Sequence, residues 1–388
     1  MYRLTRLTLT DFRNYAALTW RPAARLAVVT GPNGSGKTNL LEAVSLLVPG
    51  RGLRGARVAE LARQASDASG RWGVAARVLR DGAEVELGTG TPPDGPADRR
   101  VFRLNGASPR SQAEIAEMVA AVWLTPSMDR LFQEGASGRR RFLDRLVWAL
   151  EPGHAREVSA YETAMGGRNR LLAAGSADPG WLAGLEDSMA RHAVAVSAGR
   201  LGLVEQLNAA LASGATGTFP AARLDLLCSV ADRLRDSPAL AVEDWLREAL
   251  AEARARDTAS GSAGVGTHRA DMQLSDAETG LAAAQASTGQ QKALLIGVVL
   301  GHAALIAGVR GAPPLLLLDE PAVHLDAGRR AALFRVLAEG AAQVLLTGTD
   351  ADVFHPLRGA AEGLLAGGGA LRQDPAFAPS ASVFSSLA

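Results

Sequence analysis

Apolar and polar positions follow different patterns in successive parts of this chain. Over residues 2–10 they alternate, which predicts a β-strand. Residues 25–30 carry a short apolar run instead, which is typical of a strand buried on both faces. Residues 39–48 then have the pattern of a helix. The N-terminal part of the chain is therefore predicted to mix strands and helices.

The central part of the chain differs in composition and in the spacing of its apolar residues. Residues 126–255 are rich in Ala, Leu, Arg and Glu at helical spacing, which predicts a helical insertion, and residues 258–266 form a Ser/Gly/Ala-rich seam. After that seam the strand and helix patterns return. The other expected strands are residues 73–79 and 83–88, joined around Asp81-Gly82, and residues 99–105, 315–318 and 343–346. Two other helices are expected: one begins near residue 290, and the other covers residues 327–337.

These patterns predict an α/β domain interrupted by a mostly helical domain. With 388 residues, the chain has material for two or three domains. The expected division places the N-terminal half of the α/β domain at residues 1–125, the inserted helical arm at 126–258, and the C-terminal half of the α/β domain at 259–388.

A glycine-rich loop lies between the strand at 25–30 and the helix at 39–48. It fits the phosphate-binding pattern G-x-x-x-x-G-K-[ST] at every fixed position. Backbone N–H groups of such a loop converge on phosphate oxygens, and the next helix offers its positive end to the same anion. Lys37 is expected to reach the β- and γ-phosphates of ATP, and the Thr38 hydroxyl to coordinate Mg²⁺. The predicted nucleotide-binding residues of this segment are Gly31, Pro32, Asn33, Gly34, Ser35, Gly36, Lys37, Thr38 and Asn39.

An acidic pair follows the apolar run at 315–318. Asp319 and Glu320 stand at the carboxyl end of this predicted strand, where ligands bind in open α/β sheets. Asp319 is expected in the Mg²⁺ shell, and Glu320 is the candidate catalytic residue that polarises the attacking water, alongside Lys37. Without the glycine loop, an ordinary strand capped by solvated carboxylates would be the favoured explanation of the pair.

A third motif precedes the helix expected near residue 290. It reads Ser287-Thr288-Gly289-Gln290-Gln291-Lys292, and small or hydroxyl residues before a helix can expose N–H groups to a second anion. A plain N-cap explains the same pattern. Ser287, Gly289 and Gln290 are candidate phosphate contacts, and Asp326 is expected beside the same sheet edge. Lys292 either steers these phosphates or lies solvated in the first helical turn.

The charge balance limits where DNA could bind. The chain holds 41 Lys and Arg against 40 Asp and Glu, so a nucleic-acid contact must come from local clusters. Only Lys37 and Lys292 are lysines, which indicates an arginine bias. The best candidate clusters are Arg139-Arg140-Arg141 and the series Arg51, Arg54 and Arg57, although solvated surface arginines would have the same appearance.

Cysteine content and hydropathy bear on the compartment. The single cysteine, Cys228, excludes an intramolecular disulfide and a cysteine-built zinc site, and it fits a reducing cytosol. The first residues lack a signal-peptide pattern, because Arg3, Arg6 and Asp11 interrupt the apolar positions. The uncharged stretch 293–309 is expected to be a buried helix rather than a membrane span.

Together, the glycine loop, helical insertion, Ser-x-Gly-Gln-type motif and acidic pair resemble the ABC-type head of the SMC-like repair ATPases. Within that group the chain is most similar to the RecF family, and the resemblance covers nearly its whole length. It implies an ABC-type P-loop ATPase head with an inserted helical arm. Beyond the phosphate loop, the segments that carry the resemblance are residues 9–15, 124–126, 137–144, 168–172 and 266–271.

The resemblance implies a DNA-binding protein of recombinational repair, replication-fork maintenance and the response to DNA damage, including the SOS response. Such proteins bind ATP with Mg²⁺, dimerise head to head, bind gapped DNA or single-strand/double-strand junctions, and work with RecR and RecO in loading recombinase, with hydrolysis triggering release. Carried over to this chain, Ser287, Gly289 and Gln290 would contact the ATP held by the neighbouring subunit. The expected location is the cytoplasm, without membrane contact.

Two positions depart from the common ABC pattern. The place of the switch histidine reads Leu346-Thr347-Gly348-Thr349-Asp350, so a γ-phosphate sensor is expected at Thr347 or Thr349. No Q-loop glutamine stands at Pro126-Ser127-Met128. The motif Ser-Thr-Gly-Gln-Gln, in place of the transporter sequence Ser-Gly-Gly-Gln, favours the RecF branch.

Three other readings remain open at this stage. A transporter ATPase subunit would need a membrane partner and a compact helical subdomain. A long-armed SMC or hook protein would need heptads over hundreds of residues, and the hook would need paired cysteines. An ATP-binding scaffold with negligible turnover would carry the same motifs, because motifs set geometry and not rate.

Overall fold

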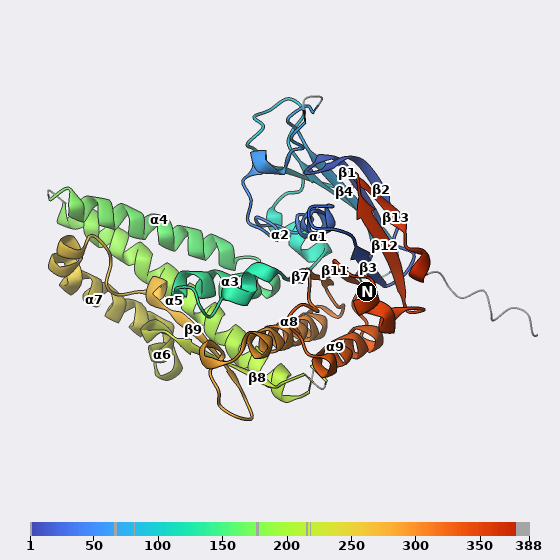
Figure 1. The fold of residues 1–388 in the computed structure, drawn as a ribbon. Coiled ribbons are helices and arrows are strands. Elements are labelled where there is room, and N and C mark those ends of the chain that lie inside the picture. Colours follow the sequence, from blue (N-terminus) through green and yellow to red (C-terminus); the bar gives the residue numbers. More distant parts are fainter. Residues whose placement is uncertain are drawn as a thin grey trace, which may run out of the picture. The chain divides into compact units, whose positions relative to one another are not determined.

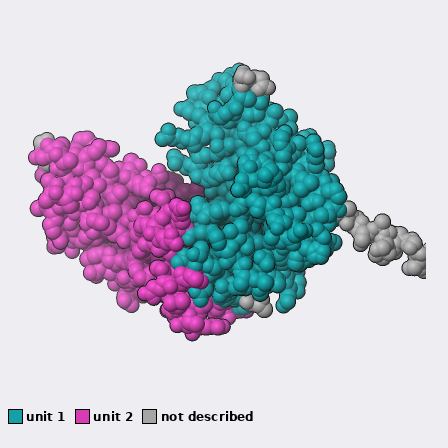
Figure 2. All heavy atoms as spheres, in the orientation of Figure 1, with its two compact units in different colours: residues 1–129, 214–220, 288–388 teal, residues 130–213, 221–287 magenta. Residues whose placement is uncertain are grey.

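The chain forms two compact units in a computed structural model. The structure describes residues 2–65, 68–80, 82–175, 178–214, 216–217 and 219–377, so the predicted turn residue Asp81 and the end of the predicted C-terminal domain lie outside it. One unit, which we call the head, comprises residues 1–129, 214–220 and 288–388, and the other, the arm, comprises residues 130–213 and 221–287 (Figure 2).

A mostly parallel sheet forms the centre of the head. Its strand order is β13-β12-β3-β11-β10-β7, with only β13 antiparallel to its neighbour. The apolar runs predicted at residues 25–30, 315–318 and 343–346 form three central strands, which are buried along their whole length as such runs require. The strands are β3 (Leu26–Thr30), β7 (Ala121–Leu124), β10 (Leu315–Leu318), β11 (Val344–Gly348), β12 (Ala361–Gly367) and β13 (Ala370–Gln373).

The head also contains an antiparallel sheet in the order β2-β1-β4-β5-β6. The alternation predicted over residues 2–10 forms its longest strand, and the hairpin predicted at residues 73–88 is confirmed. Strand β2 was not expected; it forms by antiparallel pairing with β1. The strands are β1 (Tyr2–Phe12), β2 (Tyr15–Trp20), β4 (Gly73–Arg80), β5 (Ala83–Gly90) and β6 (Val101–Leu104).

Helices pack on these sheets (Figure 1). Helix α1 contacts β10 and β11 of the parallel sheet and also β1 of the antiparallel sheet. Helix α8 contacts β7, and although it is long and apolar enough to cross a membrane, 72% of its most apolar window is buried. It is therefore a core helix of the head. The head helices are α1 (Lys37–Ser45), α2 (Gln112–Met118), α8 (Thr288–Arg310) and α9 (Ala327–Glu339), with short 3₁₀ turns at Val58–Leu61, Pro126–Arg130, Asp352–Leu357 and Pro375–Phe377.

The arm is mostly helical, as its texture predicts, with α4 and α5 packed side by side (Figure 1). A small antiparallel sheet of β8 and β9 was not expected. The helices of the arm are α3 (Ala136–Leu150), α4 (His154–Ala173), α5 (Pro179–Ala212), α6 (Ser229–Asp236) and α7 (Ala239–Ser260). The strands of the arm are β8 (Ala222–Leu227) and β9 (Asp271–Asp276), and its 3₁₀ turns are Thr267–Arg269 and Ala283–Gln285.

The units divide the chain at places other than the predicted boundaries 125/126 and 258/259. The arm begins at Arg130 and extends to Ser287, because β9 pairs with β8 over its full length and so belongs to the arm. Residues 214–220, inside the predicted insertion, belong to the head, where the Pro220 carbonyl lies 3.3 Å from the place that a Cβ on Gly297 would take. A seam in composition does not show which partner strand a later segment will pair with.

A buried ionic cluster joins three helices of the arm. Arg168 on α4 has no exposed surface and donates to Glu186 on α5 and Asp257 on α7, at 2.9 and 2.7 Å. It also donates to the Leu250 carbonyl. A buried guanidinium is tolerated only when its donors are matched in this way. The arm segment 168–172 of the family resemblance thus contains the residue that cross-links the helices.

A buried tyrosine contacts a half-buried histidine in the arm. The Tyr161 hydroxyl lies 2.6 Å from His268 Nδ1, and His268 Nε2 lies 2.8 Å from the Ala263 carbonyl. A neutral imidazole satisfies both contacts, as acceptor and as donor. Burial lowers the pKa of His268, so folding favours the neutral ring.

We therefore expect the arm to lose stability as the pH falls below about 6.5, the ordinary pKa of histidine, because the unfolded chain then binds a proton that the folded arm excludes. Urea unfolding at pH values on either side should show a smaller pH dependence for His268→Gln, which can keep a donor and an acceptor. An equal pH dependence in both proteins would contradict this assignment.

Candidate nucleotide-binding site

The glycine loop follows β3 and leads directly into α1, as predicted. Its glycines Gly31, Gly34 and Gly36 have φ values of 145°, 80° and 105°, which side chains rarely adopt. A Cβ on Gly31 would lie 2.6 Å from the Ala366 carbonyl of β12, and one on Gly36 would lie 2.4 Å from the Asn14 side chain. The loop therefore needs glycine both for its backbone shape and for the close approach of its neighbours.

The first turn of α1 is left without a side-chain cap. Its N-cap is Gly36, and no side chain accepts from the first N–H groups of the helix. Such N–H groups, with the positive end of the helix dipole, form an anion site. The Ser35 hydroxyl is buried with no hydrogen-bond partner among the described residues. Both features fit a bound phosphate.

Lys37 lies almost fully buried inside this loop. Its Nζ donates to the carbonyls of Gly31 and Pro32 at 2.7 and 2.9 Å, which uses two of the three ammonium donors. Burial lowers the pKa of Lys37, and the nearby carboxylates of Glu320 and Asp319 oppose that shift. The ammonium is thus held at the centre of the loop and within the electrostatic field of the acidic pair.

The acidic pair meets the glycine loop at the carboxyl edge of the parallel sheet. Asp319 directly follows β10, and its Oδ1 accepts from the Thr38 hydroxyl at 2.9 Å and from the Thr347 hydroxyl at 2.7 Å. Thr38 belongs to α1 and Thr347 to β11, so one carboxylate oxygen joins three elements. Residues separated by 281 positions in the chain are brought together as the sequence predicts.

Glu320 has an unusual backbone. Its φ is 49°, in the left-handed region, which costs a residue with a side chain on the order of 1–3 kcal/mol. Its N–H donates to the Thr347 hydroxyl at 3.0 Å. Thr347, expected as a γ-phosphate sensor, therefore uses its hydroxyl proton on Asp319 and its oxygen lone pair on Glu320. It is a support of the acidic pair.

The turn between β1 and β2 holds the glycine loop from the other side, a role that sequence reasoning missed. The Asn14 side chain donates to the Ser35 carbonyl at 3.2 Å and accepts from Asn39 at 2.7 Å. The Tyr15 hydroxyl donates to the Gly36 carbonyl, and burial raises the pKa of Tyr15 to about 12, so this donor stays protonated. The available signal was the family resemblance of residues 9–15.

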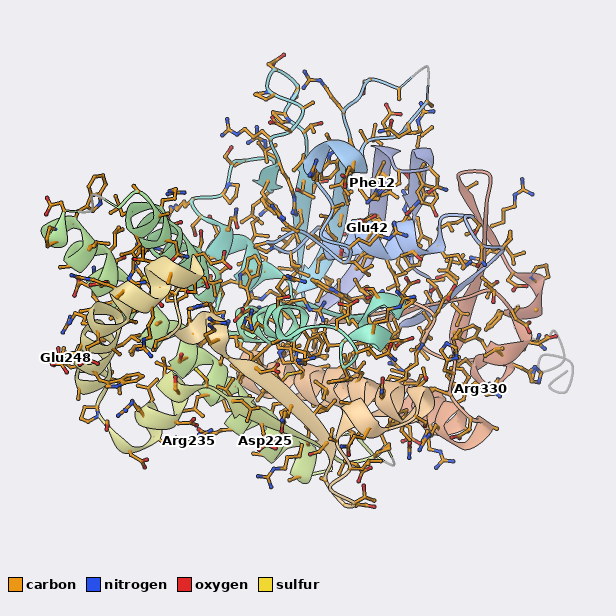
Figure 3. The ribbon with its side chains drawn as sticks, turned by 60° about the vertical axis from the view of Figure 1, so that its left-hand side comes forward. Phe12, Glu42, Asp225, Arg235, Glu248 and Arg330 are labelled. Carbon is orange, nitrogen blue, oxygen red and sulfur yellow. The ribbon has the colours of Figure 1, made fainter. Side chains whose placement is uncertain are left out.

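A buried carboxylate anchors the same turn to α1. Glu42 on α1, labelled in Figure 3, has no exposed surface and accepts two hydrogen bonds of 2.8 Å from Arg13. Arg54 also donates to Glu42, at 3.1 Å, and to Asn39 at 2.7 Å. Arg54, one of the candidate DNA contacts, is thus engaged by the nucleotide-loop helix.

The third motif, residues 287–292, spans the end of the arm and the start of α8. Ser287 is the last residue of the arm, and Gly289 and Gln290 lie in the first turn of α8 in the head. A Cβ on Gly289 would lie 2.7 Å from the His324 carbonyl, so glycine lets this turn pack on the loop after β10. Asp326, predicted as a nucleotide contact, caps α9 by accepting from the Arg329 N–H at 2.8 Å.

Lys292 differs from both sequence interpretations. It is only 1% exposed, so it is not a solvated first-turn residue. Its Nζ lies 3.3 Å from the Asp129 carboxylate and donates to the Glu320 carbonyl at 3.0 Å. These contacts turn the ammonium inward, toward the acidic pair of its own head.

Mg²⁺ would be held here by Thr38 and Asp319. No cluster of three or more His, Cys, Asp or Glu side chains suited to a metal occurs among the described residues. Mg²⁺ commonly takes one or two protein ligands and completes its shell with water and substrate phosphates. The hydrogen-bonded Thr38 hydroxyl and Asp319 carboxylate, beside the glycine loop, fit this mode of coordination.

Comparison with known proteins agrees with this geometry. The family model described as RecF/RecN/SMC N terminal domain matches residues 3–360. A DNA replication and repair protein RecF from Mesorhizobium japonicum is 48% identical over 92% of this chain and 94% of its own length. Its counterpart from Agrobacterium fabrum is also 48% identical, over 91% of this chain and 94% of its own length. The chain belongs to the RecF family. It is thus a DNA replication and repair protein.

Solved structures show the fold of this RecF-family chain. The structure titled recombination mediator protein RecF-ATPrS in the RecFOR pathway superimposes with a TM-score of 0.81 at 22% identity, over 96% of this chain and 98% of that chain. An Smc head bound to the C-winged helix domain of ScpA gives a TM-score of 0.53 at 16% identity, over 95% of this chain and 96% of that chain. The chain therefore has an ABC-type ATPase head with an inserted helical arm.

Two arginines of the run 139–141 pair with the segment 266–271, which also carries the resemblance to the RecF family. Arg139 binds both carboxylate oxygens of Asp271, at 2.7 and 2.9 Å, and Arg140 donates to the Ala270 carbonyl at 2.8 Å. Arg139 and Arg140 therefore have acceptors within the arm, and a DNA contact of the run 139–141 stays a prediction. Arg141 is exposed, as are Arg51 and Arg57 in the head.

Proposed function

We propose that this RecF-family chain binds ATP at the edge formed by the glycine loop, α1 and the acidic pair. The observation that carries the proposal is the hydrogen bond from Thr38 to Asp319, which places the phosphate loop against the carboxyl end of β10. The residues proposed to hold the nucleotide phosphates are Gly31, Pro32, Asn33, Gly34, Ser35, Gly36, Lys37, Thr38 and Asn39. The structures of the RecF relatives with ATP and ATPrS, by their titles, support this assignment.

Hydrolysis of ATP is the second part of the proposal. Bound Mg²⁺ would supply charge neutralisation for the phosphates at Thr38 and Asp319. Lys37 stabilises negative charge that develops on the transferred phosphoryl group, because its ammonium is fixed within the loop. Glu320 accepts a proton from, and orients, the attacking water. Glu320 directly follows Asp319, the residue proposed to bind the metal, which suits this role.

Head-to-head dimerisation is proposed to complete each site. Ser287, Gly289 and Gln290 of one subunit would contact the nucleotide of the other, since the positive N-terminal end of a helix suits an anion. Gly289 fixes this turn against the His324 carbonyl of the loop that leads to Asp326. Asp326 acts as the cap of α9 in that arrangement.

The cellular role proposed is the one its relatives' names give them, replication and repair of DNA. The ATP-bound dimer would bind gapped DNA or single-strand/double-strand junctions in the cytoplasm and, with RecR and RecO, help to load recombinase. Of the candidate clusters, Arg51, Arg54 and Arg57 in the head and Arg141 in the arm are exposed, and a dimer would present two copies of each to DNA. Contacts to phosphates carry no sequence information.

Binding to gapped and to fully duplex DNA of equal length tests this role. With ATP and Mg²⁺ we expect tighter binding to the gapped DNA, and a loss of about tenfold or more in affinity between 50 and 200 mM salt as counterions are released. Without ATP, or with a Lys37→Ala protein, the preference should disappear. Salt-independent binding would refute the contacts between arginines and DNA phosphates. Equal binding with and without ATP would refute DNA binding by an ATP-bound dimer.

A further inference from the structure

Both backbone polar groups of Glu320 are bound by side chains. The N–H donates to Thr347 Oγ1 at 3.0 Å, and the carbonyl accepts from Lys292 Nζ at 3.0 Å. These two contacts bracket the residue whose φ of 49° lies in the left-handed region. A residue with a side chain keeps such a conformation only where its surroundings enforce it.

The two supports are themselves fixed. Thr347 has no exposed surface, and its hydroxyl also donates to Asp319, so it ties the acidic pair to β11. Lys292 is 1% exposed, with the Asp129 carboxylate 3.3 Å from its ammonium. A buried ammonium requires an anion and matched acceptors, and the Glu320 carbonyl is one of its two acceptors among the residues that the structure describes.

The choice of lysine is informative in a chain that otherwise uses arginine. Outside the glycine loop, where Lys37 donates to two carbonyls, arginines serve several backbone carbonyls of the head: Arg25 donates to the end of α9, Arg100 to the carbonyl of Leu46 just after α1, and Arg310 to Ala116 of α2. At Glu320 the donor is a lysine. A compact ammonium can sit between one carboxylate oxygen and one carbonyl, where a planar guanidinium needs a wider set of acceptors.

We propose that Lys292 and Thr347 are positioning residues that hold the Glu320 backbone in its left-handed conformation and thereby aim the Glu320 carboxylate at the attacking water. This inference rests on the proposed role of Glu320 in ATP hydrolysis. Lys292 acts within its own head, two residues after Gln290 of the segment proposed to contact the neighbouring ATP. Misplacement of a reacting group by about 1 Å can cost about 100-fold in rate.

Steady-state ATP hydrolysis by three variants tests the proposal. Lys292→Met removes the ammonium donor to the Glu320 carbonyl with little change in volume, while the longer contact from the Val323 N–H at 3.4 Å remains. Thr347→Val removes both hydroxyl contacts with the same shape. We expect each to lower kcat by about 10- to 100-fold with a KM for ATP within about threefold of the unchanged protein. Thr347→Ser keeps the hydroxyl and should restore most of kcat.

Arg310→Met is the matched control. Arg310 lies on the same helix as Lys292 and donates to the Ala116 carbonyl at 2.6 Å, away from the acidic pair. It should lower thermal stability to a similar degree and leave kcat unchanged. An equal fall of kcat in Arg310→Met, or an unchanged kcat in both Lys292→Met and Thr347→Val, would overturn the proposal.

Amide hydrogen exchange gives a readout that does not need hydrolysis. In the nucleotide-free protein, exchange in a peptide covering Glu320 should be faster in Lys292→Met and Thr347→Val than in Arg310→Met, because the backbone there is released. If the unaltered protein hydrolyses no ATP, the proposed role in ATP hydrolysis fails, while this measurement still tests whether Lys292 and Thr347 hold the Glu320 backbone. Unchanged exchange in both variants would refute that role.

Discussion

Glu320→Gln is expected to retain ATP binding and to lower the rate of hydrolysis by about 100- to 1,000-fold, the usual effect of losing a general base. The glutamine keeps the size of the side chain and the backbone contacts of residue 320 with Thr347 and Lys292. Only the proton-accepting carboxylate is lost. The ATP-bound dimer should therefore persist longer on DNA, which sedimentation with ATP can follow.

The exposed Glu339 at the end of α9 provides a control for loss of one carboxylate. Glu339→Gln should hydrolyse ATP at the rate of the unaltered protein. If Glu320→Gln has an unchanged rate and dimer lifetime, Glu320 does not activate the water. If the unaltered protein itself shows negligible turnover, the chain is an ATP-binding scaffold and release from DNA must have another cause.

Lys37→Ala is expected to weaken ATP binding by about 100-fold, because an ammonium-to-phosphate contact contributes about 1.5–3 kcal/mol or more in a buried site. Lys37→Arg keeps the positive charge but should also bind ATP poorly. The guanidinium is wider than the space in which Nζ now contacts the carbonyls of Gly31 and Pro32. Titration calorimetry with ATP and Mg²⁺ measures both effects.

Arg335→Ala, at an exposed position on α9, removes one positive charge far from the loop in sequence and should leave ATP affinity unchanged. Wild-type affinity in Lys37→Arg would show that the charge of residue 37 suffices and that its shape does not matter. Wild-type affinity in Lys37→Ala would remove the glycine loop from the proposed ATP site.

In the arm, the sequence located charged residues correctly but did not show which residues they pair with. The arginine run at 139–141 has the composition of a DNA contact, yet Asp271 and Ala270 bind two of its members. Arg168 was recognised only as part of a family segment, and its partners Glu186 and Asp257 lie 18 and 89 positions away. Composition records that a charge exists, but only the packed chain shows whether another residue neutralises it.

The sequence by itself determined the α/β head, the helical insertion, the glycine loop and the acidic pair at the end of a buried strand. These features are local: hydrophobic period, glycine spacing and chain order suffice to specify them. The tertiary structure decided what Lys292, Thr347 and Asn14 do, because their partners come from distant strands and helices. It also decided where the arm ends, since strand pairing between β8 and β9 joins segments that no local pattern relates.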